Sequence, residues 1–364
     1  MHEWRNDRKD AFSTLSSFQS DPERLGVINL IRGLYLGFLN REPDSAGLLY
    51  WSAEMESGAD IQTVLQGILN SDEYITKTCA IHNVETLKQA VARYARSFLA
   101  SSPITIVDIG AQQLPDEDHV YAAMGQYDVP KNIVGFEPLE KLNAVNGAHK
   151  SSEDTQLLAT FVGDGELHTF HINKPESTSS LLPFNELVTH ELVGLSALAT
   201  KTTELVQTQR LDESLVNYSY IDFLKLDIQG FELPALLNST QVLERTQVVH
   251  CEVSFLEIYR GQALFSEIEI FLREMGFSFI DFSFSCRYPY HNSSNRVAHD
   301  RLGWADAIFF RESASSLSER ELFVQSLIAL LIYGKHSLAA ALANRCNAEF
   351  SRLFDAPPAY DVAK

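Results

Sequence analysis

Between positions 25 and 78 apolar residues recur every three or four positions, which is the period of an amphipathic helix. The pattern is carried by Val27, Ile31, Leu34 and Phe38 in a first helix and by Ile61, Leu65 and Ile68 in a third. Residues 45–55 predict a helix between them, with Asp44 as its N-cap and Gly58 as the stop after it. The segment shows no strand pattern, so we predict a small all-helical domain.

From position 104 the pattern changes to short apolar runs that end at an acid or a glycine. Residues 104–109, 132–136 and 223–226 are runs of this kind, with helical spacing between them, and 246–255, 277–284 and 305–310 predict later strands. Strands that are apolar almost throughout and alternate with helices are typical of a parallel sheet covered on both faces. We therefore predict an α/β fold, a doubly wound and mostly parallel sheet.

Two further elements follow from local patterns. Asp164-Gly165 predicts a tight turn between strands at 158–162 and 167–170. Residues 319–354 predict a long helical extension, whose apolar face is formed by Leu322, Val324, Leu327, Leu330 and Leu331. The predicted organisation is a tail at 1–24, the helical domain at 25–80, a connecting helix at 81–100, an α/β domain at 101–312 and the helical extension at 313–364.

The amino-acid composition excludes some classes of binding partner. The chain has 364 residues, a formal net charge of −19 and a pI of about 5.0, which is a poor match for nucleic acid or an anionic membrane. No run of about 20 apolar residues predicts a membrane span. The polar N-terminus lacks the apolar core of a secretion signal, and the four scattered cysteines form no zinc or disulfide pattern. We expect a cytoplasmic protein with reduced thiols.

Acids stand at the ends of three predicted strands. Asp108 precedes Gly110, Glu137 follows the next strand, and Asp227 comes before Gly230 and Glu232. Ligands of open α/β sheets bind at these strand ends, and an acid after the second strand can hold both hydroxyls of a ribose. The pattern favours a nucleoside-containing cofactor. For the Asp227 segment taken alone, a buried strand followed by a solvated turn remains the alternative.

The turn after the first predicted strand, at residues 110–118, distinguishes between two classes of cofactor. A nicotinamide site would need G-x-G-x-x-G to hold a pyrophosphate at a helix N-terminus. Here residues 110–118 lack the second and third glycines and contain three acids, which would repel a pyrophosphate. A cofactor without phosphate and with a cationic centre, such as S-adenosylmethionine, fits better than NAD.

Residues 104–284 resemble the FkbM-type family of S-adenosylmethionine-dependent O-methyltransferases. The matching segments are 107–111, 135–138, 177–181, 223–232 and 252–277, and the most specific is Phe-Leu-Lys-Leu-Asp-Ile-Gln-Gly-Phe-Glu at 223–232. The resemblance implies the Rossmann-like class I methyltransferase fold, a seven-stranded sheet with its last strand antiparallel. It also implies a cofactor site formed by Asp108, Gly110, Ala111, Glu137, Pro138, Asp164 and Asp227.

The chain departs from this family where Asn-x-x-Gly usually follows the Gly-Ala of the first turn. Residues 112–118 replace that motif, so the amino-acid end of the cofactor is held differently or the site has decayed. For methyl transfer, Asp227 is the first candidate for the base that takes the hydroxyl proton, Glu232 is the second, and Lys225 tunes Asp227. Glu252 is a further candidate. His250, Tyr259 and His291 are possible contacts, although a structural role is favoured for each, and we predict no metal site.

Residues 34–44 together with Gly47, Tyr50, Trp51, Gly58 and 71–74 resemble phycobilisome-linker-like helical domains of bacterial proteins. That resemblance implies assembly or binding to a protein partner. For Tyr50 and Trp51 we favour a role in the core over direct contact with a ligand. Our hypothesis is an O-methyltransferase acting on a hydroxyl of a sugar, in a surface polysaccharide or glycolipid, or of a secondary metabolite. The alternatives are a catalytically inactive, methyltransferase-like scaffold and a nicotinamide oxidoreductase.

Overall fold

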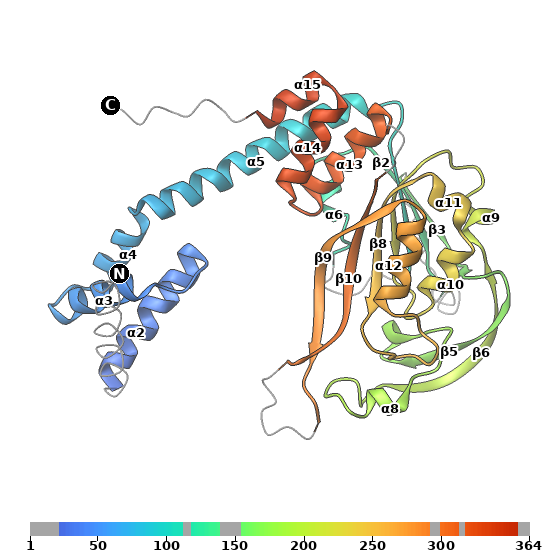
Figure 1. Cartoon of the computed structure of the whole chain (residues 1–364), viewed down its shortest axis with the longest axis horizontal. Helices are drawn as coiled ribbons and strands as arrows, with labels where there is room; N and C mark the ends of the chain where they lie inside the picture. The colour runs from blue at the N-terminus through green and yellow to red at the C-terminus, as the bar shows by residue number, and fades with distance from the viewer. Residues whose placement is uncertain (1–21, 112–117, 139–153, 292–298, 313–316, 356–364) are drawn as a thin grey trace, which may run out of the picture. The chain divides into compact units, whose positions relative to one another are not determined.

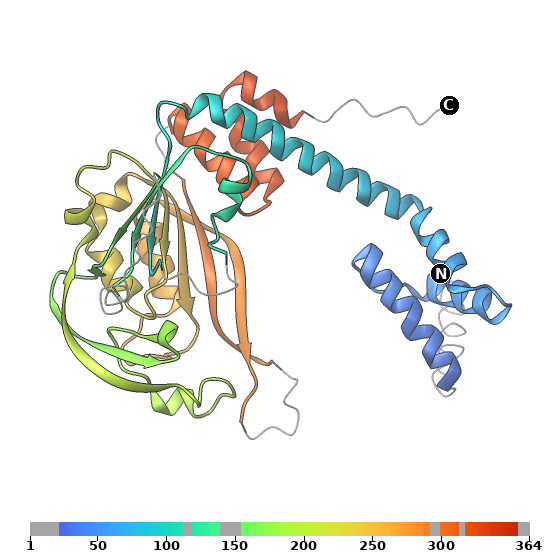
Figure 2. The same cartoon turned by 180° about the vertical axis from the view of Figure 1, so that it is seen from behind.

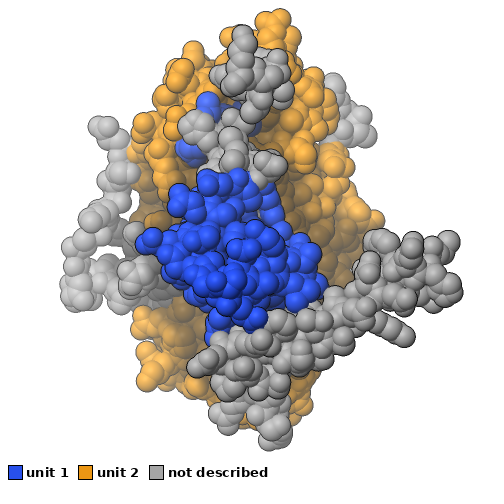
Figure 3. Space-filling view, turned by 90° about the vertical axis from the view of Figure 1, so that its left-hand side faces the viewer, with its two compact units in different colours: residues 1–87 blue, residues 88–364 orange. Residues whose placement is uncertain are grey.

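The computed structural model describes residues 22–111, 118–138, 154–291, 299–312 and 317–355. The chain divides into two compact units, residues 1–87 and 88–364, which Figure 3 colours separately. Helix α5 (Asp72–Phe98) runs from the first unit into the second. The finer predicted boundaries at 24, 80, 100 and 312 stay predictions.

The first unit is helical. Its elements in this range are α2 (Pro22–Leu34), a π-helical turn η1 (Tyr35–Leu39), α3 (Ser45–Glu56) and α4 (Ile61–Leu69). The Asp44 carboxylate accepts a hydrogen bond from the Gly47 N–H at 2.7 Å, which confirms the predicted cap of α3. Gly58 has φ +104°, so it ends that helix as predicted.

The apolar stripe of the first helix matches most of the predicted one, because Ile31 is buried and Val27 and Leu34 pack against the core. Ile28, Ile31, Tyr35 and Leu39 are buried, whereas Phe38 is exposed. Both stripes have helical spacing, and the π turn at 35–39 places Tyr35 and Leu39 against Val64 and Ile68. Tyr50, predicted in the core, is 57% exposed, whereas Trp51 does pack against the core of this unit.

The second unit is built on a seven-stranded sheet (Figure 1). In spatial order its strands are β3 (Thr155–Leu158), β2 (Lys131–Phe136), β1 (Ile104–Ile109), β7 (Ile221–Leu226), β8 (Thr246–Ser254), β10 (Arg301–Arg311) and β9 (Phe277–Tyr288). The first five strands pair in parallel, and β10, the last strand in sequence, is antiparallel to both β8 and β9. This arrangement confirms the predicted Rossmann-like fold.

The two faces of the sheet differ along the same strands. Residues such as Leu224, Leu226, Val249 and Cys251 belong to one apolar core with α9 (Leu211–Ser214), α10 (Glu232–Leu237), α11 (Thr240–Glu244) and α12 (Phe265–Glu274). Because side chains alternate along a strand, the intervening residues point to the other face. The polar ones and the one indole among them include Asp108, Lys225, Asp227, His250, Glu252, Trp304 and Asp306.

The other face is covered in part by the C-terminal helices. Helix α13 (Glu319–Leu331) lies against β7 and β8, and its Phe323 contacts Tyr94 and Phe98 of α5. Figure 2 shows α13 and α14 (His336–Cys346) beside the end of α5. The predicted helical extension at 319–354 is present, but it is not continuous, because Gly334 with φ +61° separates α13 from α14. Residues 322–331 are all buried, so α13 has no solvated face.

A small second sheet has the order β4 (Phe161–Val162), β6 (Ala199–Gln209), β5 (Leu167–Lys174). Gly165 has φ +89°, so the predicted turn exists, but β4 and β5 do not pair as a hairpin. Each pairs with β6 instead, and the predicted strand 158–162 is divided between β3 and β4. The remaining short elements are α6 (Ala122–Gln126), η3 (Glu176–Thr178), α8 (Glu186–Thr189), α15 (Ala348–Ser351) and η4 (Arg352–Phe354).

In the parts of the chain that the structure describes, no helix has the length and apolar character needed to span a membrane. Cys251, Cys286 and Cys346 are free thiols, and Cys251 is buried in the core of the sheet.

Candidate active site

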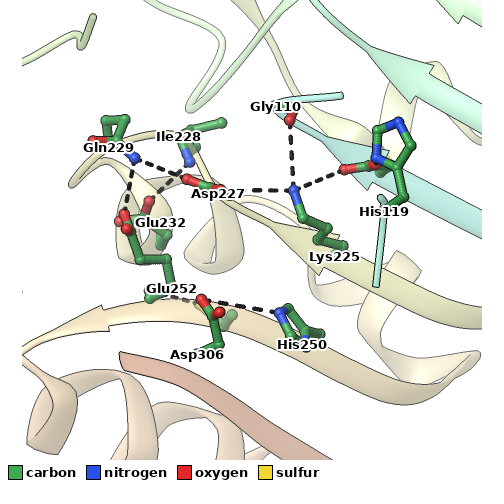
Figure 4. Close-up of polar contacts among 12 residues, drawn as sticks. Gly110, His119, Lys225, Asp227, Ile228, Gln229, Glu232, His250, Glu252 and Asp306 are labelled. Carbon is green, nitrogen blue, oxygen red and sulfur yellow. Dashed lines mark hydrogen bonds and ion pairs between the residues drawn. The ribbon is translucent and has the colours of Figure 1, made fainter. Parts of the chain in front are cut away.

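A cavity of about 880 Å³ opens at the carboxyl ends of β1, β2, β7 and β8. Of the predicted site residues, Gly110, Glu137, Pro138, Lys225 and Asp227 line it. Asp108, Ala111, Asp164 and Glu232 are not among its lining residues. The strand register aligns Asp108 with Lys225 and Lys225 with His250, so these three side chains form a row across the sheet. Figure 4 shows the polar contacts around this row.

Gly110 brings two strand ends together. Its φ is +81°, and a Cβ at this position would lie 1.9 Å from the backbone oxygen of Asp227. The Gly110 N–H donates to Phe136 O and the Asp227 N–H donates to Ile109 O, both at 3.0 Å. Only glycine permits this close approach, so the first turn is fixed by its backbone. Ala111, the next residue, is buried and also donates to Phe136 O.

Asp108 is fully buried and has three side-chain partners. Lys225 Nζ lies 3.2 Å from one carboxylate oxygen, and the other accepts the Tyr121 hydroxyl at 2.8 Å with His119 Nδ1 at 3.2 Å. Burial alone would raise the pKa of Asp108, but the charge of Lys225 and the two hydrogen bonds lower it to about 2. Asp108 is therefore ionised, and the charge of Lys225 neutralises it inside the protein. This buried pair supports the turn at Gly110.

Lys225 connects Asp108 to Asp227. Its ammonium lies 3.7 Å from Asp227 Oδ2 and donates to Gly110 O at 3.5 Å. Burial lowers the pKa of Lys225, but Asp108 and Asp227 outweigh that effect and raise it above its ordinary value. The amine is thus held protonated. The Lys225 side chain is only 14% exposed, so this lysine is not a surface charge.

Asp227 is held from its other side by Gln229. Gln229 Nε2 donates to Asp227 Oδ1 at 2.9 Å and lies 3.2 Å from Glu252 Oε2. Gln229 Oε1 accepts the Tyr259 hydroxyl at 2.8 Å, and Gln229 O accepts the Ser180 hydroxyl at 2.6 Å. Gln229 has φ +57°, a left-handed conformation that a non-glycine residue keeps only when its surroundings hold it there. The Asp227 side chain remains 38% exposed, so it faces the cavity.

Glu232 holds the same loop from below. Its carboxylate accepts the N–H groups of Ile228 at 3.0 Å and Gly230 at 3.1 Å, at the start of α10. Burial raises the pKa of Glu232 to about 7. The structure therefore places Glu232 behind the cavity wall, where it shapes the loop that carries Asp227.

A second group of polar residues lies over β8 and β10. Burial, with the charge of Asp227 and other carboxylates, raises the pKa of Glu252 well above its ordinary value. Burial raises the pKa of Asp306 to about 6. His250 Nδ1 is 3.0 Å from the Tyr333 hydroxyl and Nε2 is 4.0 Å from Asp306 Oδ1. Burial and the nearby Lys225 lower the pKa of His250 to about 3, so this imidazole is neutral.

The remaining predicted residues lie in three places. Glu137 and Pro138 line the cavity at the end of β2, and the Glu137 N–H donates to Leu158 O at 3.0 Å. Asp164 lies at the small sheet, where its carboxylate contacts His168 Nε2 at 2.8 Å and the Thr208 hydroxyl at 3.2 Å. His291 contacts Ser196 and is not among the lining residues. Of the altered loop 112–118, residues 112–117 lie outside the described residues.

Sequence reasoning missed several members of the site. Tyr121 and His119 follow β1 in a segment without a regular pattern, so nothing marked them as partners of Asp108. Asp306 lies inside the apolar run that predicted the strand at 305–310. A single acid in such a run is a signal for a functional residue, and the strand prediction did not use it. Gln229 lay within the most specific matching segment, between the two acids that drew attention.

The described residues contain no cluster of three or more His, Cys, Asp or Glu side chains that could hold a metal ion.

A search of curated proteins gave no match. Residues 15–78 match the family model called Domain of unknown function (DUF4214), a match that leaves the linker-like resemblance a prediction. Residues 108–279, which begin at the end of β1 and include β2, β7 and β8, match the model of the Methyltransferase FkbM domain. Together with the seven-stranded fold, this match supports a methyltransferase of the FkbM type in the second unit.

Proposed function

We propose that the second unit is an S-adenosylmethionine-dependent O-methyltransferase. The observation that carries the proposal is the position of Glu137 and Asp227 at the ends of two strands that flank β1 and its Gly110 turn, in one cavity. A carboxylate at the end of β2 suits the two hydroxyls of a ribose. The acidic lining suits a cationic ligand and disfavours a pyrophosphate, so the donor set fits S-adenosylmethionine better than NAD.

Each contact of the turn has a task in this proposal. Glu137 accepts the ribose hydroxyls, and Gly110 lets the ligand approach the backbone. Asp227 lies next to Gly110 and still faces the cavity, so it orients the acceptor hydroxyl and takes its proton. Lys225 orients the Asp227 carboxylate, because its ammonium lies 3.7 Å from Asp227 Oδ2.

The chemical step is an in-line displacement. S-adenosylmethionine, when bound, supplies an electrophilic methyl group on its sulfonium. In the proposed step the acceptor oxygen would take the methyl group, with the electron pair of the broken S–CH₃ bond left on sulfur, and Asp227 would take the hydroxyl proton. The walls of the site act mainly by aligning the two reactants. The products are the methyl ether and S-adenosylhomocysteine.

Family resemblance points to an acceptor hydroxyl on a sugar of a bacterial surface polysaccharide or glycolipid, or on a secondary metabolite. We further propose a cytoplasmic protein whose first unit binds a protein partner. The competing proposal is a methyltransferase-like scaffold without turnover, which the altered loop at 112–118 favours.

Calorimetric titration with S-adenosylmethionine, S-adenosylhomocysteine and NAD tests the cofactor. We expect the first two to bind and NAD not to bind. Glu137→Gln should weaken binding by about tenfold or more, the cost of losing a charged hydrogen-bond acceptor. Glu186→Gln changes an exposed acid of α8 in the same way and serves as the matched control. The absence of binding by both sulfur compounds would contradict the proposal and favour the scaffold.

A further inference from the structure

The cavity reaches further across the sheet than one nucleoside requires. Glu137 stands at the end of β2, whereas Trp304 and Asp306 line the same cavity from β10, four strands away in the order β2-β1-β7-β8-β10. At about 4.8 Å between neighbouring strands, that separation is roughly 19 Å. Asp227 on β7 lies between the two ends. The cavity therefore has a second half, over β8, β10 and β9, that the proposed cofactor site does not use.

Aromatic side chains form the wall of this second half. Trp304 Nε1 donates to the Tyr288 hydroxyl at 2.9 Å, and the rings of Trp304 and Phe284 lie 5.2 Å apart. Gly303 leaves room for this arrangement, because a Cβ there would lie 2.3 Å from the Tyr288 ring. Phe284 lines the cavity and yet is 53% exposed. An exposed phenylalanine in a cavity, beside an indole fixed by its own hydrogen bond, presents an apolar surface that water covers poorly.

A polar group stands beside this wall. Asp306 follows Trp304 by two residues on β10, so both side chains point to the same face of the sheet. Within the described parts of the chain, the Asp306 carboxylate accepts no hydrogen bond, and neutral His250 lies 4.0 Å away. A half-buried carboxylate of this kind is costly unless a ligand donates to it. The hydroxyl of Ser283 lies on the neighbouring strand and bonds the Asp306 backbone oxygen at 3.3 Å.

We propose that Trp304 and Asp306, with Tyr288 and Phe284, form the acceptor subsite, and that it takes a saturated polyhydroxylated ring. The apolar face of the ring stacks on Trp304, and hydroxyls at its edge donate to Asp306. A hydrocarbon-like metabolite would leave Asp306 without a donor, and an open polar chain would leave the aromatic wall uncovered. This inference rests on the proposed methyltransferase function and selects the sugar-like acceptor from the two classes named above.

The test uses the full-length chain saturated with S-adenosylhomocysteine and saturation-transfer NMR. The probes are methyl α-D-mannopyranoside, methyl β-D-glucopyranoside and methyl α-L-rhamnopyranoside, with catechol as a planar aromatic comparison. We expect at least one glycoside to bind more strongly than catechol. Trp304→Ala and Asp306→Asn should each weaken its binding at least tenfold, while the affinity for S-adenosylhomocysteine changes less than twofold.

Two further variants separate binding from folding. Trp304→Phe keeps an aromatic face and should restore most of the glycoside binding lost in Trp304→Ala. Tyr290→Ala removes an exposed aromatic residue that follows β9 but does not line the cavity, so it should leave binding unchanged.

The failures are distinguishable. If S-adenosylhomocysteine binds but no glycoside does, or if catechol alone binds, the acceptor subsite is overturned and the methyltransferase proposal stands. Equal loss in Tyr290→Ala also overturns the subsite. If S-adenosylhomocysteine itself does not bind, the proposed function fails first and the subsite fails with it.

Discussion

Asp108 and Asp306 project from the same face of the same sheet, and their surroundings differ in almost every respect. Asp108 is fully buried between a lysine, a tyrosine and a histidine, and its pKa falls to about 2. Asp306 is about one quarter exposed and faces a neutral histidine at 4.0 Å, and its pKa rises to about 6. The first carboxylate has its partners inside the protein, whereas the second lacks them.

The difference separates groups that hold the site together from groups that are open to a ligand. Buried charges with complete internal partners stabilise a local geometry. A carboxylate left with few partners at a cavity wall is a candidate for substrate contact. By this criterion Asp108 and Glu232 support the site, and Asp227 and Asp306 face its ligands.

The largest expected effect comes from removing the cation beside Asp108. Lys225→Met leaves that buried carboxylate without its counter-charge, so we expect a loss of about 3–5 kcal/mol in the free energy of unfolding, measured by urea denaturation. The double variant Asp108→Asn/Lys225→Met removes both charges and should recover most of the loss. A loss below about 1 kcal/mol in the single variant would show that Asp108 has no such dependence on Lys225.

Next in size is the effect of Asp227→Asn on methyl transfer. Removing a general base typically costs about 10²–10⁴-fold in rate, and we expect a fall in this range. The unfolding free energy should change little, because Asp227 is partly exposed. The rate of S-adenosylhomocysteine formation with the bound glycoside measures it, with Glu186→Gln as the control. Full activity in Asp227→Asn would exclude it as the base.

Tyr259→Phe tests whether the Gln229 contacts hold the Asp227 loop. The variant loses the single O–H donor of Tyr259, which is shared between Gln229 Oε1 and Thr178 O. We expect a loss of about 2 kcal/mol in stability, because both acceptor oxygens are left without this donor. Hydrogen exchange at residues 228–230 should also accelerate. Tyr290→Phe is the matched control, and unchanged exchange in Tyr259→Phe would contradict the role.

The smallest expected effect is a difference in pH dependence between the two aspartates. The pKa of Asp306 is about 6 in the folded chain and about 3.9 when unfolded, so its ionisation costs stability as pH rises from about 4 to 6. We compare the free energy of unfolding of Asp306→Asn with that of the wild type, by thermal unfolding at pH 4.5 and pH 7.5. The difference should shift in favour of the variant by on the order of 1–2 kcal/mol at the higher pH.

Asp108 should show the opposite sign. Its folded pKa of about 2 lies below the unfolded value, so it contributes stability that is present above pH 4 and lost towards pH 2. Asp108→Asn should be less stable than wild type at pH 7.5. The same sign for both variants would remove the distinction between the two carboxylates.

The fold was predictable because nearly continuous apolar runs, separated by helical segments, leave few arrangements other than a parallel sheet. The acids at the ends of β1, β2 and β7 were predictable for the same reason, since the carboxyl ends of parallel strands meet at one edge. The partners of those acids were not predictable. Lys225 and Asp108 are 117 positions apart in the chain, and only strand order and register make them neighbours.

The small sheet shows a different limit. The Asp164-Gly165 pair predicted a hairpin from local turn chemistry, yet β6, more than thirty residues later, pairs with both flanking strands. A turn pattern shows that the chain changes direction. It does not show which strand forms hydrogen bonds with the two strands that flank the turn. Asp164, predicted for the cofactor, is correspondingly bonded to His168 and Thr208 in that sheet.

Core and cavity residues alternate along β7 and β8, and this alternation limits the sequence changes that the two strands tolerate. Lys225, Asp227, His250 and Glu252 alternate with Leu224, Leu226, Val249 and Cys251, which belong to the core. Deleting one residue within either strand would rotate every following side chain to the opposite face, placing charges in the core and aliphatic groups in the cavity. Variation in these strands is therefore restricted to substitution at fixed length, whereas the connecting loops can accept insertions and deletions.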